Sequence, residues 1–163
     1  MPRREYKFGP KDNDHVNYGT SGLLQQFTTT RCGRTIQYDE PIDAATPTEE
    51  FFLCELNGGV PGTIHPLKHD DDATYTLLGQ DPRACPITLD HPSVSQQHAV
   101  VQWRRRISAD GEGLVVPYLM DINSTNGTTL NGAAVNAERY TELCPDDIIR
   151  LGKADTLLAF MQV

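Results

Sequence analysis

From Phe51 to the C-terminus, short apolar runs alternate with turn signals, and this pattern constrains the fold more than any other feature. Short β-branched or apolar runs bounded by Gly, Pro, Asn and Asp are typical of strands. No stretch in this part carries the sustained apolar period of a long helix. The pattern predicts an all-β fold, an antiparallel sandwich or barrel of eleven short strands. The candidates are Phe51–Leu56, Thr63–Leu67, Thr74–Leu78, Ile87–Leu89, Ala99–Arg106, Leu114–Ile122, Thr128–Leu130, Ala133–Val135, Tyr140–Leu143, Ile148–Leu151 and Leu157–Val163.

One of these candidates, Ala99–Arg106, alternates clearly, with Ala99, Val101 and Trp103 on the side expected to face the core. We expect Trp103 to anchor the core rather than to stack on a nucleic-acid base. The strand ends in three arginines, Arg104, Arg105 and Arg106. A solvated strand end is the preferred interpretation of this run, and contact with RNA or an acidic partner is the alternative.

Two polar segments, His91–Ala99 and Asp121–Gly132, interrupt the apolar runs. In the second segment, short polar side chains bond to nearby backbone, and Gly and Asn accept positive φ. Asn131-Gly132 adds a hairpin-type turn signal. In the first segment, Pro92 stops regular structure before a strand begins at Ala99. Loops that present hydroxyls and amides suit an anion or a peptide backbone.

Motifs in these segments follow a characteristic order: Gly79, then Ser95 and His98, then Ser124–Thr128 and Asn131-Gly132. This order and spacing resembles the forkhead-associated (FHA) domain, a phosphothreonine-peptide-binding β-sandwich. The resemblance covers roughly residues 50–163. It is fairly specific, because several motifs occur in order.

Within that family, the chain is similar to the FHA subunits of the spliceosomal retention and splicing (RES) complex, the pre-mRNA leakage and Smad nuclear-interacting proteins. The runs Asp90–Ser93, Pro117-Tyr118 and Glu138–Leu143 carry this closer similarity. The resemblance implies a nuclear, non-enzymatic protein-interaction module that acts in pre-mRNA splicing and retention.

The resemblance also implies a binding site. A phosphothreonine ester carries about −1.5 to −2 charge and three strong acceptor oxygens, so its receptor must supply several donors. By resemblance, Ser95 and Thr125 donate to the phosphate, Asn126 holds the peptide backbone, and His98 is a buried brace. The implied phosphopeptide-binding residues are Gly79, Gln80, Arg83, Ser95, Gln96, Thr125 and Asn126, and the implied structural residues are His98, Gly127, Thr128 and Asn131.

One position departs from the family pattern. Directly after Gly79 the family carries an arginine that clamps the phosphate, and this chain has Gln80, which can donate a hydrogen bond but brings no charge. The loss is expected to weaken phosphopeptide binding about tenfold or more. Arg83, in the same loop, is expected to supply part of the charge. Two interpretations stay open, a weakened phosphothreonine receptor and a phosphate-independent scaffold.

The N-terminal part has a different composition. Residues 1–16 are predicted to be a disordered tail, because they are rich in charge and poor in apolar residues. Residues 17–49 lack a sustained period and are predicted to be an extended segment that acquires structure on a surface. Positions within Ser21–Leu24 and Gly33–Pro41 resemble the tail by which the RES subunit docks on the RNA-recognition-motif protein, beside a Bud13-like subunit. The predicted anchors are Leu23, Leu24, Phe27 and Ile36, and packing on the chain's own domain is the alternative.

Composition and isolated motifs exclude several other classes. The net charge of −8 argues against a general nucleic-acid or membrane-surface binder. No apolar run approaches the ~18 residues needed to span a bilayer, and a soluble intracellular protein with four reduced cysteines is expected. Pro66 between His65 and His69 breaks any helix that would align them, so no metal site is expected, nor any cofactor. Ser95, His98 and Asp90 lack the nucleophile elbow of a hydrolase, so no enzyme is expected.

Overall fold

The computed structural model of the chain describes residues 5–6, 30–67 and 72–163, which form strands and loops without a helix. All eleven predicted strands occur within three residues of their predicted ends, as β4 to β14. The strands are β1 Glu5–Tyr6, β2 Thr30–Arg31, β3 Arg34–Thr35, β4 Phe51–Asn57, β5 Val60–Pro66, β6 Tyr75–Gly79, β7 Ile87–Thr88, β8 Ala99–Ile107, β9 Gly113–Asp121, β10 Thr128–Leu130, β11 Ala133–Ala134, β12 Tyr140–Glu142, β13 Ile148–Leu151 and β14 Thr156–Gln162.

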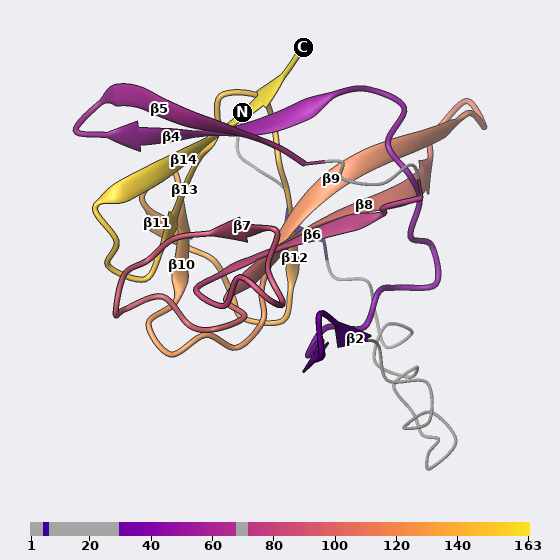
Figure 1. Cartoon of the computed structure of the whole chain (residues 1–163). Helices are drawn as coiled ribbons and strands as arrows, with labels where there is room; N and C mark the ends of the chain where they lie inside the picture. Colours follow the sequence, from indigo (N-terminus) through magenta and orange to yellow (C-terminus); the bar gives the residue numbers. More distant parts are fainter. Residues whose placement is uncertain (1–4, 7–29, 68–71) are drawn as a thin grey trace.

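Two six-stranded sheets form a sandwich, which confirms the predicted fold class (Figure 1). One sheet has the order β1-β12-β9-β8-β6-β7 and the other the order β11-β10-β13-β14-β4-β5. All strand pairs in these sheets are antiparallel except β6 and β7, which are parallel. The short strands β2 and β3 form a separate hairpin. No described segment forms a helix of the length and apolarity that crossing a bilayer requires.

The main core lies between the two sheets. Trp103 is 1% exposed and packs on Phe51, whose ring centroid is 5.8 Å away. Ala99 and Val101 belong to the same cluster, so the inward face of β8 is the predicted one. Burial of these apolar side chains is the principal stabilising contribution to the sandwich.

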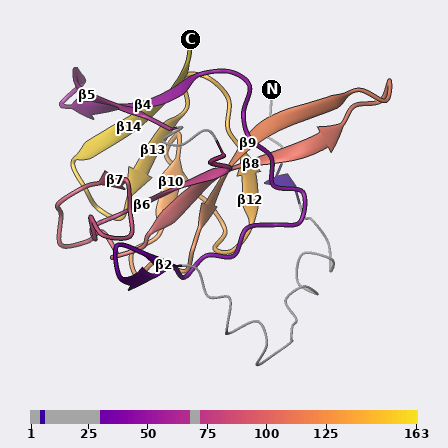
Figure 2. The same ribbon diagram turned by 45° about the vertical axis from the view of Figure 1, so that its right-hand side comes forward.

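A second buried layer covers the outer face of the first sheet. We call residues 36–45 the strap, because they cross this face between the β2–β3 hairpin and β4 (Figure 2). Ile36 and Tyr38 of the strap are 6% and 4% exposed. They pack against side chains that point outward from the sheet, namely Leu77, Val100, Tyr118 and Tyr140. The first sheet is therefore buried on both faces.

Polar contacts fix the strap to β8 and β12. The Tyr38 hydroxyl donates to Gln102 Oε1 (2.7 Å) and lies 2.6 Å from the Tyr140 hydroxyl oxygen. Arg104 Nε and Nη2 donate to the two carboxylate oxygens of Asp43 at 2.6 and 2.9 Å. The Arg104 guanidinium also lies 4.5 Å from the centre of the Tyr140 ring. Burial desolvates the phenolate form and, with the neighbouring Tyr140 adding to the effect, raises the pKa of Tyr38 well above its ordinary value.

These contacts correct the interpretation of the arginine run. Arg104 is 1% exposed, so it is not part of a solvated strand end and is not available to RNA. Arg105 is exposed and Arg106 is half-buried. The error has a physical cause: alternation along β8 predicted a polar outer face, but the strap covers that face and supplies a carboxylate for its cation.

The strap also bears on the N-terminal predictions. Ile36, one of the predicted docking anchors, is buried against the chain's own sandwich, so its side chain is not available to a partner in this structure. The other anchors, Leu23, Leu24 and Phe27, lie outside the described residues. Within the predicted tail, Glu5 and Tyr6 form β1, which pairs with Thr141 and Tyr140 of β12.

Candidate phosphopeptide site

Three loops meet at one end of the sandwich, the lower end in Figure 1: residues 80–86 between β6 and β7, 89–98 between β7 and β8, and 122–127 between β9 and β10. Hydrogen bonds join them. The Thr125 backbone N–H donates to Ser95 Oγ (3.1 Å), and Asn126 Nδ2 donates to the Ser93 carbonyl (2.9 Å). The Gln80 backbone N–H donates to the Ser95 carbonyl (2.9 Å). The structure thus brings Gln80, Ser95, Thr125 and Asn126 together.

The hydroxyl groups at this end retain donor capacity. Ser95 Oγ accepts the Thr125 N–H, so its own O–H proton stays available for a ligand oxygen. Thr125 and Asn126 are exposed, and Ser95 is half-buried. Asn126 uses Nδ2 toward Ser93, and its exposed carbonyl oxygen can accept from a peptide N–H. These residues can therefore bind an anion and a peptide backbone side by side.

His98 braces two of the loops from below. Its Nδ1 accepts the Ser95 backbone N–H (3.0 Å), so Nε2 carries the proton and donates to the Gly127 carbonyl (2.8 Å). The side chain is fully buried. Burial lowers the pKa of His98 below 6.5, while the Gly127 carbonyl and Asp121 oppose the shift. A neutral imidazole is what this arrangement needs, because a second proton on Nδ1 would face the Ser95 N–H.

Asp121 organises the loop between β9 and β10, and sequence reasoning assigned it no role. Its Oδ1 accepts the Ser124 N–H (2.8 Å), and its Oδ2 accepts the hydroxyls of Ser124 and Thr128 (both 2.6 Å). Asp121 is 2% exposed, and these donors stabilise its buried charge. An Asp at a strand end, with Asn-Ser two residues further on, is an Asx-turn signal that could have revealed this role.

Several structural positions of the motif have clear contacts. A Cβ atom on Gly79 would lie 2.3 Å from the Gln96 carbonyl oxygen, so only glycine fits there. Gly127 has a φ of 79°, which favours glycine. Asn131 donates from Nδ2 to Asp147 (3.0 Å) and accepts the Ile148 N–H at Oδ1 (2.8 Å), so it links two turns away from the site.

Gln80, which stands where the family has arginine, is engaged with its own loops. Its Nε2 donates to the His91 carbonyl (3.2 Å), and its Oε1 accepts from Gln96 Nε2 (3.0 Å). The two glutamines thus bond to each other across the loops. Gln80 holds the loops together, and a ligand would have to displace one of these bonds to use it fully.

Two arginines that the sequence analysis did not single out also lie at this site. Arg31 Nη1 donates to the Arg83 carbonyl (3.3 Å), and Arg34 Nε lies 3.3 Å from Asp81 Oδ2. Both belong to the β2–β3 hairpin, which both views place at the loop end of the sandwich (Figures 1 and 2). Arg83 itself is exposed, and its guanidinium has no hydrogen bond or ion pair with any residue in the described part of the chain. Neither contact has a local sequence signal, because Arg31 and Arg83 lie 52 residues apart and Arg34 and Asp81 are similarly distant.

Other groups singled out in the sequence are not brought to this site. His65 Nε2 lies 2.8 Å from Glu55 Oε1 on the β4–β5 hairpin, and no described cluster of His, Cys, Asp or Glu could hold a metal ion. All four cysteines are free thiols.

Comparison with known proteins identifies the fold family. Residues 76–152 match the FHA domain. The chain is 34% identical to the FHA domain-containing protein DDL of Arabidopsis thaliana over 92% of its length, and 35% identical to Smad nuclear-interacting protein 1 of Mus musculus over 83%. It spans 48% and 36% of those two relatives. Pre-mRNA leakage protein 1 of Saccharomyces cerevisiae is 27% identical, with 90% of this chain and 85% of the yeast protein covered.

Solved structures agree with the sequence matches. The full-length yeast Pml1p superimposes with a TM-score of 0.66 at 25% identity, covering 78% of this chain and all of that one. The yeast Pml1 splicing factor, from a study of its integration into the RES complex, gives 0.64 at 24% identity, covering 79% and 99%. The MEK1 FHA domain in complex with a phosphothreonine peptide of HOP1 gives 0.50 at 26% identity, covering 68% and 95%. The chain is therefore a member of the FHA-domain family.

Proposed function

We propose that this chain is a non-enzymatic FHA module that binds a threonine-phosphorylated segment of a partner protein. The observation that carries the proposal is the convergence of Ser95, Thr125 and Asn126, with donors left for a ligand, on loops tied by hydrogen bonds. A relative of the same fold, the MEK1 FHA domain, has been solved with a phosphothreonine peptide, which supports the assignment.

The cellular role is proposed from the relatives. The names of the yeast and mouse relatives refer to pre-mRNA leakage and to a nuclear-interacting protein, and a yeast structure of the same fold is described as a splicing factor integrated into the RES complex. We propose a nuclear subunit of the RES complex that acts in pre-mRNA splicing and retention. Residues 17–29, with Leu23, Leu24 and Phe27, are the segment proposed to dock on the RNA-recognition-motif and Bud13-like subunits.

The division of the chain is adjusted accordingly. Ile36 and Tyr38 complete a buried cluster of the sandwich, so we propose that the folded unit includes the hairpin and the strap as well as residues 50–163. A fragment starting at residue 50 would expose Leu77, Val100 and Tyr118. Binding experiments should therefore use the full chain.

A second candidate function is a phosphate-independent scaffold that uses the same loops. The specific observation in its favour is the engagement of Gln80 with His91 and Gln96, which leaves no charge and a single free N–H where the family has arginine. Under this alternative, partner binding would not depend on threonine phosphorylation.

Titration of the full chain with matched phosphorylated and unphosphorylated threonine peptides separates the two functions. We expect the phosphorylated peptide to bind more tightly, and Ser95→Ala to remove that preference. Gln80→Arg should tighten phosphopeptide binding by about 1–3 kcal/mol, because it restores a charge-assisted, bidentate contact. Equal binding of both peptides by the wild type, with no preference created by Gln80→Arg, would establish the scaffold instead.

A further inference from the structure

The β2–β3 hairpin places two cations directly opposite each other. Its turn residues, Cys32 and Gly33, have φ values of 50° and 80°, as a two-residue turn with both central residues at positive φ requires. Arg31 and Arg34 are cross-strand partners, so their side chains leave the same face of the hairpin. Like charges in this position repel. The hairpin therefore keeps an unfavourable pair, and its surroundings must compensate.

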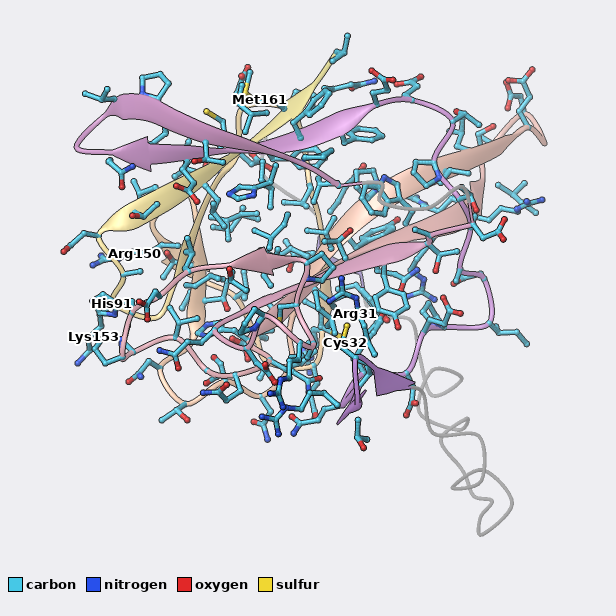
Figure 3. All side chains as sticks on the ribbon, in the orientation of Figure 1. Arg31, Cys32, His91, Arg150, Lys153 and Met161 are labelled. Atoms are coloured by element: carbon cyan, nitrogen blue, oxygen red, sulfur yellow. The ribbon has the colours of Figure 1, made fainter. Side chains whose placement is uncertain are left out.

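The surroundings are the loop that begins at Gln80. Arg34 lies 3.3 Å from the carboxylate of Asp81, the residue after Gln80, and Arg31 donates to the carbonyl of Arg83 (3.3 Å). The Asp81 backbone N–H donates in turn to the Gln96 carbonyl (3.1 Å), beside Ser95. Both arginines thus contact the loop whose family arginine is missing. Figure 3 shows Arg31 and Cys32 at the hairpin, on this end of the sandwich.

The two arginines differ in how much charge they retain for a ligand. The Asp81 carboxylate, which is largely buried, neutralises Arg34. Among the described residues, Arg31 bonds to a neutral carbonyl and pairs with no carboxylate. A guanidinium has five N–H donors, so one bond to a carbonyl leaves most of them free. Arg31 is exposed, and no described carboxylate offsets its charge at the edge of the loop.

Arg31 is also better placed than Arg83 to act as a clamp. Its bond to the Arg83 carbonyl already orders the side chain, whereas the Arg83 guanidinium has no partner among the described residues and would have to be ordered on binding. Ordering a long side chain opposes binding by about 0.5–1.5 kcal/mol. An arginine held in advance therefore contributes more of its interaction energy.

We propose that Arg31 supplies the guanidinium that position 80 lacks, so that a bound phosphothreonine is held between the hydroxyls of Ser95 and Thr125 and a cation from the N-terminal hairpin. This inference rests on the proposed phosphopeptide function and names the chain's own residue that completes that site. The β2–β3 hairpin would thus take part in phosphopeptide binding, which is a separate role from the docking proposed for residues 17–29.

The test compares four full-length proteins: wild type, Arg31→Gln, Ser95→Ala and the double variant Arg34→Gln/Asp81→Asn. Each is titrated with a phosphothreonine peptide and its unphosphorylated match at several salt concentrations. Arg31→Gln should weaken phosphopeptide binding about tenfold and flatten its salt dependence, since a charge-assisted hydrogen bond is lost. Arg34→Gln combined with Asp81→Asn removes a neutral ion pair at the same place and should change phosphopeptide binding less than about threefold. Arg31→Lys should recover part of the loss.

The outcomes distinguish a failure of the role proposed for Arg31 from a failure of phosphopeptide binding itself. If the wild type prefers the phosphopeptide and Ser95→Ala removes the preference, but Arg31→Gln binds as the wild type does, then this inference is wrong and the proposed function stands. If the wild type shows no preference, the proposed function fails and this inference fails with it. Adding Gln80→Arg to Arg31→Gln should restore affinity, which would show that the variant site is folded and lacks only a cation.

Discussion

The strap and the β2–β3 hairpin are consecutive parts of one segment, yet the strap contacts the sandwich through buried side chains and the hairpin through exposed ones. The strap buries Ile36 and Tyr38 and closes over the bidentate pair between Arg104 and Asp43. The hairpin lies on the surface, and its exposed Arg31 and Arg34 contact the loop end through the Arg83 carbonyl and the Asp81 carboxylate. Burial thus turns one arginine into part of the fold, while exposure leaves another available to a ligand.

Arg104→Ala should have the largest effect on stability. It leaves the Asp43 carboxylate without its partner and removes the cation over the Tyr140 ring, so we expect a loss of about 3 kcal/mol in the free energy of unfolding. Urea denaturation measures the change. Arg105→Ala, at the next and exposed position, is the matched control and should stay within about 0.5 kcal/mol. Equal losses of unfolding free energy in Arg104→Ala and Arg105→Ala would contradict the conclusion that Arg104 is part of the fold and Arg105 is not.

His98→Ala should rank second, and it tests the loop end directly. The variant leaves the Ser95 N–H and the Gly127 carbonyl without their partner, which we expect to cost about 1–3 kcal/mol. The wild type should also lose stability as pH falls. The folded pKa of His98 lies below its ordinary 6.5, so the unfolded chain binds more protons between the two values.

The contribution of His98 is therefore complete above about pH 6.5 and decreases as the pH falls toward the folded pKa. Stability is the better quantity to measure than peptide affinity, because the phosphate of a ligand titrates near pH 6 as well. Urea midpoints of the wild type and His98→Ala across this range isolate the histidine. A difference between the two proteins that does not shrink on acidification would contradict the neutral brace.

Arg34→Gln should have the smallest effect. Its ion pair with Asp81 has a half-exposed guanidinium, and pairs of this kind contribute about 0–1 kcal/mol. The change in the free energy of unfolding should stay below about 1 kcal/mol and disappear in high salt. A loss comparable to that of Arg104→Ala would mean that the hairpin is as much a part of the folded unit as the strap.

The fold was largely predictable from local patterns. Alternation and turn residues located β4 to β14, and the inward face of β8 with Trp103 was correct, because a strand with one face in the core has a period of two. The missing strands, β1 to β3, are two residues long each, and their pairing depends on distant contacts or a single turn. The Cys32-Gly33 turn alone was too short a signal to identify.

The candidate site was predicted in part, and the gaps have a common origin. The loop residues Ser95, His98, Thr125 and Asn126 follow a motif in sequence, and the structure brings them together. The contribution proposed for Arg31 comes from a segment outside the motif, and only its tertiary contact with Arg83 relates it to the loop that begins at Gln80. The burial of Arg104 was missed for the same reason, since Asp43 lies 61 residues away.

The contact between Tyr38 and Tyr140 spans 102 residues and has a consequence for the order of folding. Contacts between residues so far apart are expected to form late, because the entropy of closing a long loop is lost before the contact contributes any stabilising energy. During synthesis, the strap leaves the ribosome long before the surface that receives it. We expect the outer face around Leu77 and Val100 to stay open to water and to other chains until Tyr140 is in place, which would favour misassembly in that interval.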